Sequence, residues 1–184
     1  GSNGIFRLTL IRPVSRLKIL LSKLLASYIY SAGLVVFCAF WSLGIGSLVL
    51  GTGDLIVLDN GILVLNEGQA WIRMLLSFSL AIVVMCMVST LCFMFSSMVN
   101  NGIGPIIGAM FLIIVGYIII AIPLDFFTKI EPYVFVSYFN VWLDAFKDPI
   151  PWLLIGKKLS VLITYSLIFF GISAFVFLNK DIKS

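Results

Sequence analysis

The sequence contains no histidine, and charged residues of either sign are scarce. Only 11% of the 184 residues are charged, against roughly a quarter in an ordinary soluble domain. The absence of histidine removes the most common general base and metal ligand. The three cysteines, Cys38, Cys86 and Cys92, form no CxxC pair and lie inside apolar runs. We interpret them as small hydrophobic residues, because no zinc or redox ligand set can be assembled around them.

Motifs for energy conversion and catalysis are also missing. No ionisable residue lies in the middle of a long apolar run, where ion-coupled carriers and pumps place such groups. No GxxxxGK[ST] phosphate loop is present, so the chain cannot use ATP in the manner of a P-loop enzyme. We therefore expect no enzymatic activity, no catalytic residue, and no cofactor or metal bound by this chain. The absence of a basic tract interleaved with aromatics argues against a nucleic-acid partner.

What the chain has in abundance is apolar residues. They make up 61% of the sequence, and the mean hydropathy is +1.18. A helix needs ~20 residues to cross ~30 Å of hydrocarbon, and four charge-free stretches reach that length. The sequence therefore predicts an all-α integral membrane protein with a single transmembrane domain over residues 1–184. The expected spans are residues 24–50, 74–99, 103–124 and 159–178, and the expected external loops are residues 51–73 and 125–158.

Orientation follows from the Lys and Arg residues near the span ends, which are more frequent on the cytoplasmic side. With a cytoplasmic N-terminus, seven of these residues are cytoplasmic and five are external. We expect both ends of the chain to be cytoplasmic. The seven are Arg7, Arg12, Arg16, Lys18, Lys23, Lys180 and Lys183, and the five are Arg73, Lys129, Lys147, Lys157 and Lys158.

A basic amphipathic helix precedes the first span within a cytoplasmic segment over residues 5–23. If Val14 to Leu25 is wound as a helix, the leucines gather on one side and Arg16, Lys18 and Lys23 on the other. Pro13 suits its first turn. Such a helix can lie on an anionic membrane surface. It is either a simple anchor or a docking surface for a soluble partner, and periodicity leaves both interpretations open.

An aromatic stripe marks the second loop. Winding residues 135–147 as an α-helix at about 100° per residue collects five aromatics in a narrow arc. One interpretation is an aromatic belt on the outer leaflet, and the other is a re-entrant, lid-like helix that closes the outer end of a substrate path. The aromatics are Phe135, Tyr138, Phe139, Trp142 and Phe146, and the polar residues opposite are Ser137, Asn140, Asp144 and Lys147.

Small residues predict where helices approach one another. The turn signal Asn100-Asn101-Gly102 makes the second and third spans antiparallel neighbours. Gly104 and Gly108 form a GxxxG pattern at the start of the third span. This pattern indicates close helix packing, and a dimer interface is the alternative interpretation.

The N-terminal residues carry a resemblance to a known family. Residues 4–25 contain a Gly-led amphipathic stretch, the element Pro13-Val14-Ser15-Arg16, an apolar triplet, and Lys23 leading into the span. This order resembles the cytoplasmic segment of ABC-2 type transporter permeases. Residues 177–182, Phe-Leu-Asn-Lys-Asp-Ile, are similar to the short tail after the last helix of these permeases.

The resemblance is to a six-helix subunit, and it implies that two further helices precede this sequence. Residues 5–12 match the coupling helix that docks on an ATPase subunit, residues 13–23 match an elbow into the membrane, and the aromatic loop matches external re-entrant helices. The expected ATPase-coupling residues are Ile5, Phe6, Arg7, Leu8, Arg12, Pro13 and Arg16.

The function implied by the resemblance is that of a permease subunit in an ATP-driven exporter of a bacterial cytoplasmic membrane. Its partners are ABC ATPase subunits, which hold ATP and Mg²⁺, a second permease subunit that is alike or different, and membrane lipids. The alternatives are an ATP-independent channel or carrier and a membrane scaffold without a transport role.

Overall fold

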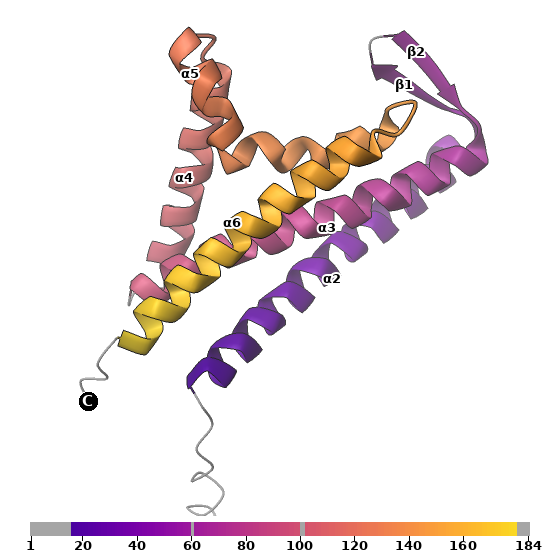
Figure 1. Ribbon diagram of the computed structural model, residues 1–184. Helices are drawn as coiled ribbons and strands as arrows, with labels where there is room; N and C mark the ends of the chain where they lie inside the picture. Colours follow the sequence, from indigo (N-terminus) through magenta and orange to yellow (C-terminus); the bar gives the residue numbers. More distant parts are fainter. Residues whose placement is uncertain (1–15, 60, 100–101, 180–184) are drawn as a thin grey trace, which may run out of the picture.

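The computed structural model of the protein describes residues 16–59, 61–99 and 102–179, and nearly all of them belong to helices (Figure 1). The elements follow one another in the order α2 (Arg16–Leu50), β1 (Leu55–Asp59), β2 (Gly61–Leu65), α3 (Glu67–Met98), α4 (Gly104–Ala121), α5 (Asp125–Ile130), η1 (Glu131–Tyr133), η2 (Phe135–Phe146) and α6 (Trp152–Asn179).

Four helices, α2, α3, α4 and α6, are long and apolar enough to cross a membrane. An α-helix satisfies its own backbone hydrogen bonds, which is what hydrocarbon demands of any spanning segment. The predicted fold class is therefore confirmed: the chain is an all-α integral membrane protein with four candidate spans.

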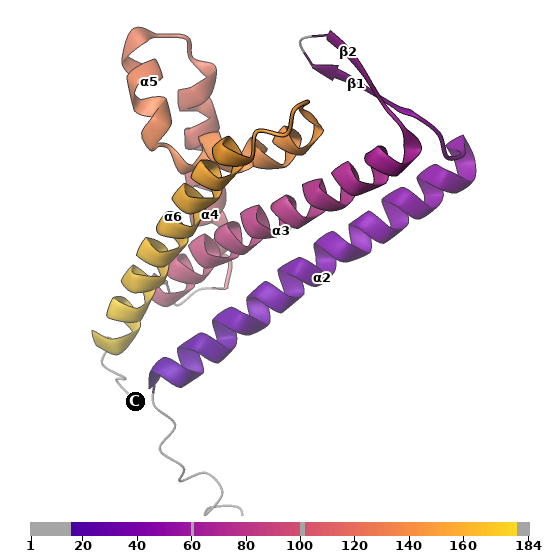
Figure 2. The ribbon, with the colours of Figure 1, turned by 45° about the vertical axis from the view of Figure 1, so that its right-hand side comes forward.

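The four long helices alternate in direction (Figures 1 and 2). The start of α2 and the end of α6 lie at one end of the molecule, here called the terminal end, and the strands lie at the opposite end, here called the hairpin end. Helix α3 is central, because it contacts α2, α4, α6 and η2. The other segments are assembled around it.

The core lies where α3, η2 and α6 meet. Leu80 and Met87 of α3 pack with Val136 of η2 and Leu162 of α6, all of them buried. A smaller cluster joins α3 to α4 through Leu91 and neighbouring side chains. Core packing therefore fixes η2 against two spans, while the outward faces of α2 and α4 stay apolar and exposed, as a lipid-facing surface requires.

Helix α2 contacts α3 through hydroxyl groups. The Tyr28 and Thr90 side-chain oxygens are 2.7 Å apart, and those of Ser31 and Ser89 are 2.6 Å apart. Hydrogen bonds of this kind between spanning helices each contribute roughly 0.6–2 kcal/mol. The two pairs lie about one turn apart on α2 and on adjacent residues of α3, and together they fix the register of α2 on α3.

Helix α2 differs from the expected elbow over residues 13–23. Its described part runs from Arg16 to Leu50 as one continuous helix, so Lys23 lies inside the helix and marks no bend. No proline occurs between Arg16 and Leu50 to break the hydrogen-bond ladder. Gly51, at a φ of 78°, follows the end of the helix, a left-handed conformation that glycine adopts without strain. The expected coupling residues 5–12 and Pro13 lie outside the described residues.

The first expected loop contains regular structure that was not predicted. Strands β1 and β2 form an antiparallel hairpin in which Ile56 pairs with Val64 and Leu58 with Ile62. Helix α3 then begins at Glu67, seven residues before the expected span at 74. The expected loop over residues 51–73 thus consists of a hairpin and the first turns of α3, and the two apolar runs around Asp59-Asn60-Gly61 are the usual sequence signal of such a hairpin.

The second expected loop is also largely helical. It holds α5, η1 and η2, and α6 starts at Trp152, so Lys157 and Lys158 lie in a helix and not in a loop. The predicted α-helix over residues 135–147 is a 3-10 helix over Phe135–Phe146. With three residues per turn, positions three apart are superposed, which aligns Val141 with Asp144. Asp144, predicted among the polar residues opposite the aromatics, is buried with Val141.

The glycine pair at the start of α4 packs against α3. A Cβ atom on Gly104 would lie 2.7 Å from a methyl carbon of Val99, and one on Gly108 would lie 2.9 Å from the ring of Phe95. Both distances are shorter than any ordinary contact. The pair thus allows close approach within one chain, at the turn between the second and third spans.

Gly116 offers a test of this packing. A Cβ atom there would lie 2.6 Å from a methyl carbon of the buried Val136, so Gly116→Ala should overpack the contact of α4 with η2. We expect it to destabilise the fold by about 1–3 kcal/mol, measured by titration with a denaturing detergent. Gly171→Ala is the control, because nothing lies within 4 Å of that position. Equal stability of the two variants would contradict the packing.

Candidate functional site

A buried carboxylate organises the hairpin end. The Asp144 side chain on η2 is only 2% exposed, and its Oδ1 atom is 2.8 Å from Nζ of Lys147. Its Oδ2 atom accepts a hydrogen bond from Nζ of Lys158 on α6. Asp144 therefore joins the end of η2 to the second turn of α6.

Arg73 of α3 holds the same end of η2 from another side. Its Nη1 atom donates to the carbonyl oxygens of Ala145 at 3.0 Å and Lys147 at 2.6 Å. Its Nη2 atom donates to Oδ1 of Asp148 at 3.2 Å. The last carbonyls of a helix lack hydrogen-bond donors within the helix. The guanidinium group of Arg73 donates to two of these carbonyls. We call Arg73, Asp144, Lys147, Asp148 and Lys158 the charged cluster.

The charged cluster keeps Asp144 ionised. Burial alone would raise the pKa of its carboxyl group, but the hydrogen bonds and charges of Lys147 and Lys158 outweigh burial and hold the pKa below its usual range. The cluster then carries three positive and two negative charges, a net charge of +1. It is an electropositive site in which every carboxylate has a cationic partner.

The cluster lies at the edge of the membrane core. Residues 159–178 of α6 contain no charge, and twenty helical residues measure ~30 Å, the thickness of the hydrocarbon. Lys158 is the residue immediately before this stretch, and Arg73 likewise precedes the charge-free part of α3. Both cations therefore mark the depth at which hydrocarbon gives way to headgroups on the hairpin side.

A pocket of about 630 Å³ opens beside the charged cluster, between β1, η2 and the start of α6. One part of its lining is charged and is formed by Asp144, Lys147 and Lys158. The rest is mainly apolar and includes β1, Met74, Leu143 and Phe146. Predominantly apolar walls with a few convergent polar groups are typical of ligand sites. We call this the charged pocket and take it as the candidate functional site.

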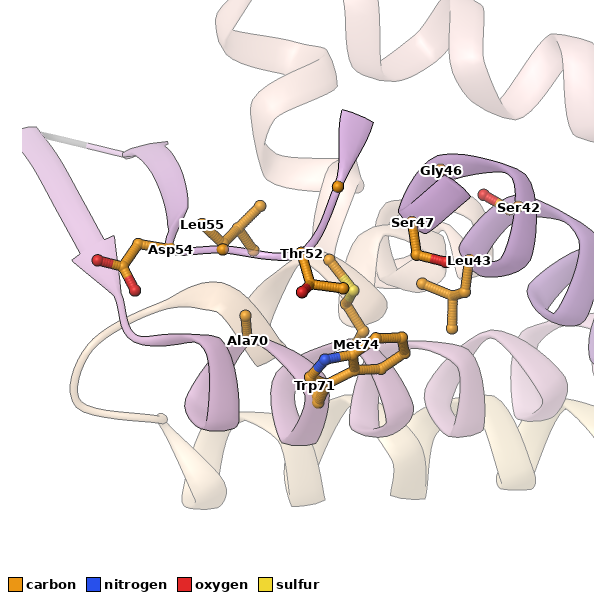
Figure 3. A pocket seen from close by; sticks show the side chains of 12 residues that line it. Ser42, Leu43, Gly46, Ser47, Thr52, Asp54, Leu55, Ala70, Trp71 and Met74 are labelled. Carbon is orange, nitrogen blue, oxygen red and sulfur yellow. The ribbon is translucent and has the colours of Figure 1, made fainter. Parts of the chain in front are cut away.

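A second cavity, of about 440 Å³, lies where α2 ends, between the connection to β1 and the start of α3. Its polar lining includes Ser42, Ser47 and Thr52, and Trp71 forms part of the opposite wall (Figure 3). The one acidic residue, Asp54, points away from the other labelled side chains (Figure 3). This cavity therefore offers hydroxyl groups and an aromatic ring but no inward charge, which makes it the weaker candidate.

The five aromatics expected on one face have separate positions in the structure. Phe135 and Phe139 turn inward, with ring centroids 5.7 Å apart, and Phe135 also contacts Phe169 of α6 at 5.9 Å. Tyr138 donates to the carbonyl oxygen of Pro132. The remaining two differ, because Phe146 lines the charged pocket and Trp142 is exposed.

The charged cluster was not predicted from the sequence. Arg73, Lys147 and Lys158 entered only the charge count for topology, and Asp144 was placed among the polar residues opposite the aromatics. The available signal was position: Arg73 and Lys158 stand at the first residue outside two charge-free runs. The sequence between them holds four acidic residues, and nothing in their spacing singles out Asp144. In the part of the chain that the structure describes, no three Cys, Asp or Glu side chains lie close enough together to hold a metal ion.

The four candidate spans, the central α3 and the pocket at the hairpin end define a polytopic α-helical membrane protein. Within that class, the model of one family, described as Protein of unknown function (DUF2705), matches residues 2–183. The chain belongs to this family. No curated protein and no solved structure matches it.

Removing the charge of Asp144 should leave the largely buried ammonium group of Lys158 facing a neutral amide and weaken the contact with Lys147. We expect Asp144→Asn to destabilise the protein by about 3 kcal/mol at neutral pH, measured by titration with a denaturing detergent. Asp148→Asn is the control, because that side chain is 56% exposed and its loss should cost at most about 1 kcal/mol.

The pH dependence gives a second readout. Because the pKa of Asp144 is lowered in the folded protein, its stabilisation is complete above the ordinary carboxyl pKa of about 3.9 and is lost as the pH falls through the folded value. The stability difference between the wild type and Asp144→Asn should therefore be constant near neutrality and shrink below about pH 4. A difference that persists unchanged in acid would contradict an ionised Asp144.

Proposed function

We propose that this chain is the membrane-spanning permease subunit of an ATP-driven ABC-2 type exporter in a bacterial cytoplasmic membrane. ATP and Mg²⁺ are held by separate ATPase subunits, and a second permease subunit completes the translocation path. The terminal end faces the cytoplasm, so that the hairpin end is external. The proposal starts from the resemblance of residues 4–25 and rests on one structural observation, the unbroken helix α2.

Helix α2 is longer than a span requires. Its charge-free part, residues 24–50, exceeds the ~20 residues that cross the hydrocarbon. The eight residues from Arg16 to Lys23 extend the same helix by about 12 Å. The element Pro13-Val14-Ser15-Arg16 leads directly into this extension. A partner that moves the start of the described helix, at Arg16, would therefore move a continuous helix that runs through the membrane.

The contacts of α2 supply a route from this helix to the hairpin end. The Tyr28–Thr90 and Ser31–Ser89 contacts join α2 to α3. Helix α3 packs on η2 and α6, and Arg73 of α3 binds the end of η2. A rigid-body shift of α2 driven by ATP binding can thus reach the charged pocket through packed elements.

The charge distribution supports the orientation. The start of the described part of α2 and the end of that of α6 lie on the same side of the molecule (Figure 2). Lys18 and Lys23 lie on the extension of α2 at the terminal end, where the positive-inside rule places Lys and Arg beside a span. On this arrangement the exit of the path lies near the charged pocket.

Purification of the protein from its native membrane tests the proposal directly. We expect an ATPase subunit with a P-loop to co-purify with this chain and to hydrolyse ATP in the complex, as identified by mass spectrometry and phosphate release. Transport by a reconstituted preparation that contains no ATPase would overturn the proposal and identify an ATP-independent channel or carrier. A stable complex without ATPase and without transport would identify a scaffold.

Helix α2 itself can be interrupted. Lys23→Pro should break the helix at a cost of about 3 kcal/mol or more, whereas Lys23→Ala keeps it intact. In both variants the native cysteines are replaced, and a fluorophore is attached to a new cysteine introduced by Thr52→Cys at the hairpin end. ATP should change the fluorescence of the reconstituted complex that carries the Ala variant. The Pro variant should hydrolyse ATP without that change. A response preserved in the Pro variant would exclude α2 as the coupling element.

A further inference from the structure

We propose that the charged pocket binds the anionic headgroup of a phospholipid from the leaflet at the hairpin end. Lys147 and Lys158 contact the phosphate group, and the apolar walls cover the first part of the lipid tails. This site does not depend on the proposed function, because lipid binding requires neither an ATPase nor a second subunit.

The charge of the pocket selects an anion. Its lining holds two ammonium groups and one carboxylate, and Asp144 has both of its oxygens engaged by them. An ammonium group donates up to three hydrogen bonds, so a lysine can bind a carboxylate and a phosphate oxygen together. The Lys147 side chain is 42% exposed and that of Lys158 is 19% exposed. Asp144 therefore positions both ammonium groups while each keeps a surface open to a ligand.

The walls select an anion that carries apolar chains. Leu55 and Val57 of β1 form one side of the pocket, and Met74 and Leu143 contribute further apolar surface. A volume of about 630 Å³ is also far larger than a phosphate group alone requires. A soluble phosphate would leave these side chains uncovered, whereas the glycerol and first methylene groups of a lipid would cover them.

The depth of the pocket matches that of lipid phosphates. Lys158 stands immediately before the ~30 Å charge-free part of α6, and six residues, or about 9 Å, separate it from Trp152 at the start of the helix. The exposed Trp152 is a residue type that favours the interface. The two lysines are thus held at the level where hydrocarbon gives way to headgroups, which is where the phosphates of the leaflet lie.

Native mass spectrometry of the full chain in an uncharged detergent tests this proposal. The probes are short-chain phosphatidylglycerol, short-chain phosphatidylcholine and glycerol phosphate, which carries the headgroup chemistry without tails. We expect one phosphatidylglycerol to bind about tenfold more tightly than phosphatidylcholine, since charge-assisted hydrogen bonds to an anion are the stronger kind. Glycerol phosphate should bind much more weakly. Equal binding of the two lipids would overturn the proposal, and tight binding of glycerol phosphate would replace the lipid with a soluble phosphate compound.

Matched variants locate the site. Lys147→Gln should weaken phosphatidylglycerol binding about tenfold without removing the buried Asp144–Lys158 contact. Lys157→Gln is the control, because Lys157 neighbours Lys158 on α6 but is exposed and does not line the pocket. If both variants bind like the wild type, or if both lose the same affinity, the lipid is held by general surface charge and the proposal fails.

The apolar wall provides an independent variant. Leu143→Ser should weaken phosphatidylglycerol binding and leave the weak binding of glycerol phosphate unchanged, because Leu143 contributes apolar surface to the pocket and no charge. The Leu143 side chain is 45% exposed. Circular dichroism of each variant verifies the fold. If Leu143→Ser binds phosphatidylglycerol as tightly as the wild type, the lipid tails do not lie in the pocket and that part of the proposal is wrong.

Discussion

The arrangement of the hairpin end depends on a single carboxylate at the edge of the hydrocarbon. Withdrawing an ionised carboxyl group from water costs several kcal/mol unless close positive charges and hydrogen bonds replace the lost hydration. Asp144 meets this demand by drawing in Lys147 from its own segment and Lys158 from α6. The end of η2 and the start of α6 are therefore constrained to adjacent positions.

The same constraint divides the molecule into two parts. Helices α3 and α6 and segment η2 share one buried core and the charged cluster. Helix α2 is attached to this assembly by two hydroxyl contacts and by packing along α3, and much of its apolar surface stays exposed. Charge therefore fastens α3, η2 and α6 to one another at one site, whereas α2 is held on α3 by hydroxyl contacts and extended packing.

The sequence pattern was sufficient to predict the spanning helices and insufficient to predict the structure of the segments that connect them. Long charge-free runs have few structural alternatives in a membrane, so the spanning helices could be predicted from composition. The connections depend on local geometry, and assuming 3.6 residues per turn over Phe135–Phe146 assigned Asp144 to the wrong face of a helix with three. The partners of Asp144 are 3 and 14 residues away along the chain, and Arg73 reaches the same segment from more than 70 residues away. A pairing that exists only after α3, η2 and α6 have packed leaves no periodic trace in the sequence.

The connection between α2 and α3 has a consequence for biogenesis. Residues 51–66, which include the hairpin, contain two aspartates and no lysine or arginine, and the next cation along the chain is Arg73. Translocation of short connections is opposed mainly by positive charge, so in the proposed orientation, with the hairpin end external, this segment can cross the bilayer during synthesis without that barrier. Insertion of the two helices as a pair would place α3 in the bilayer ahead of α4, η2 and α6, which follow it in the chain and pack against it.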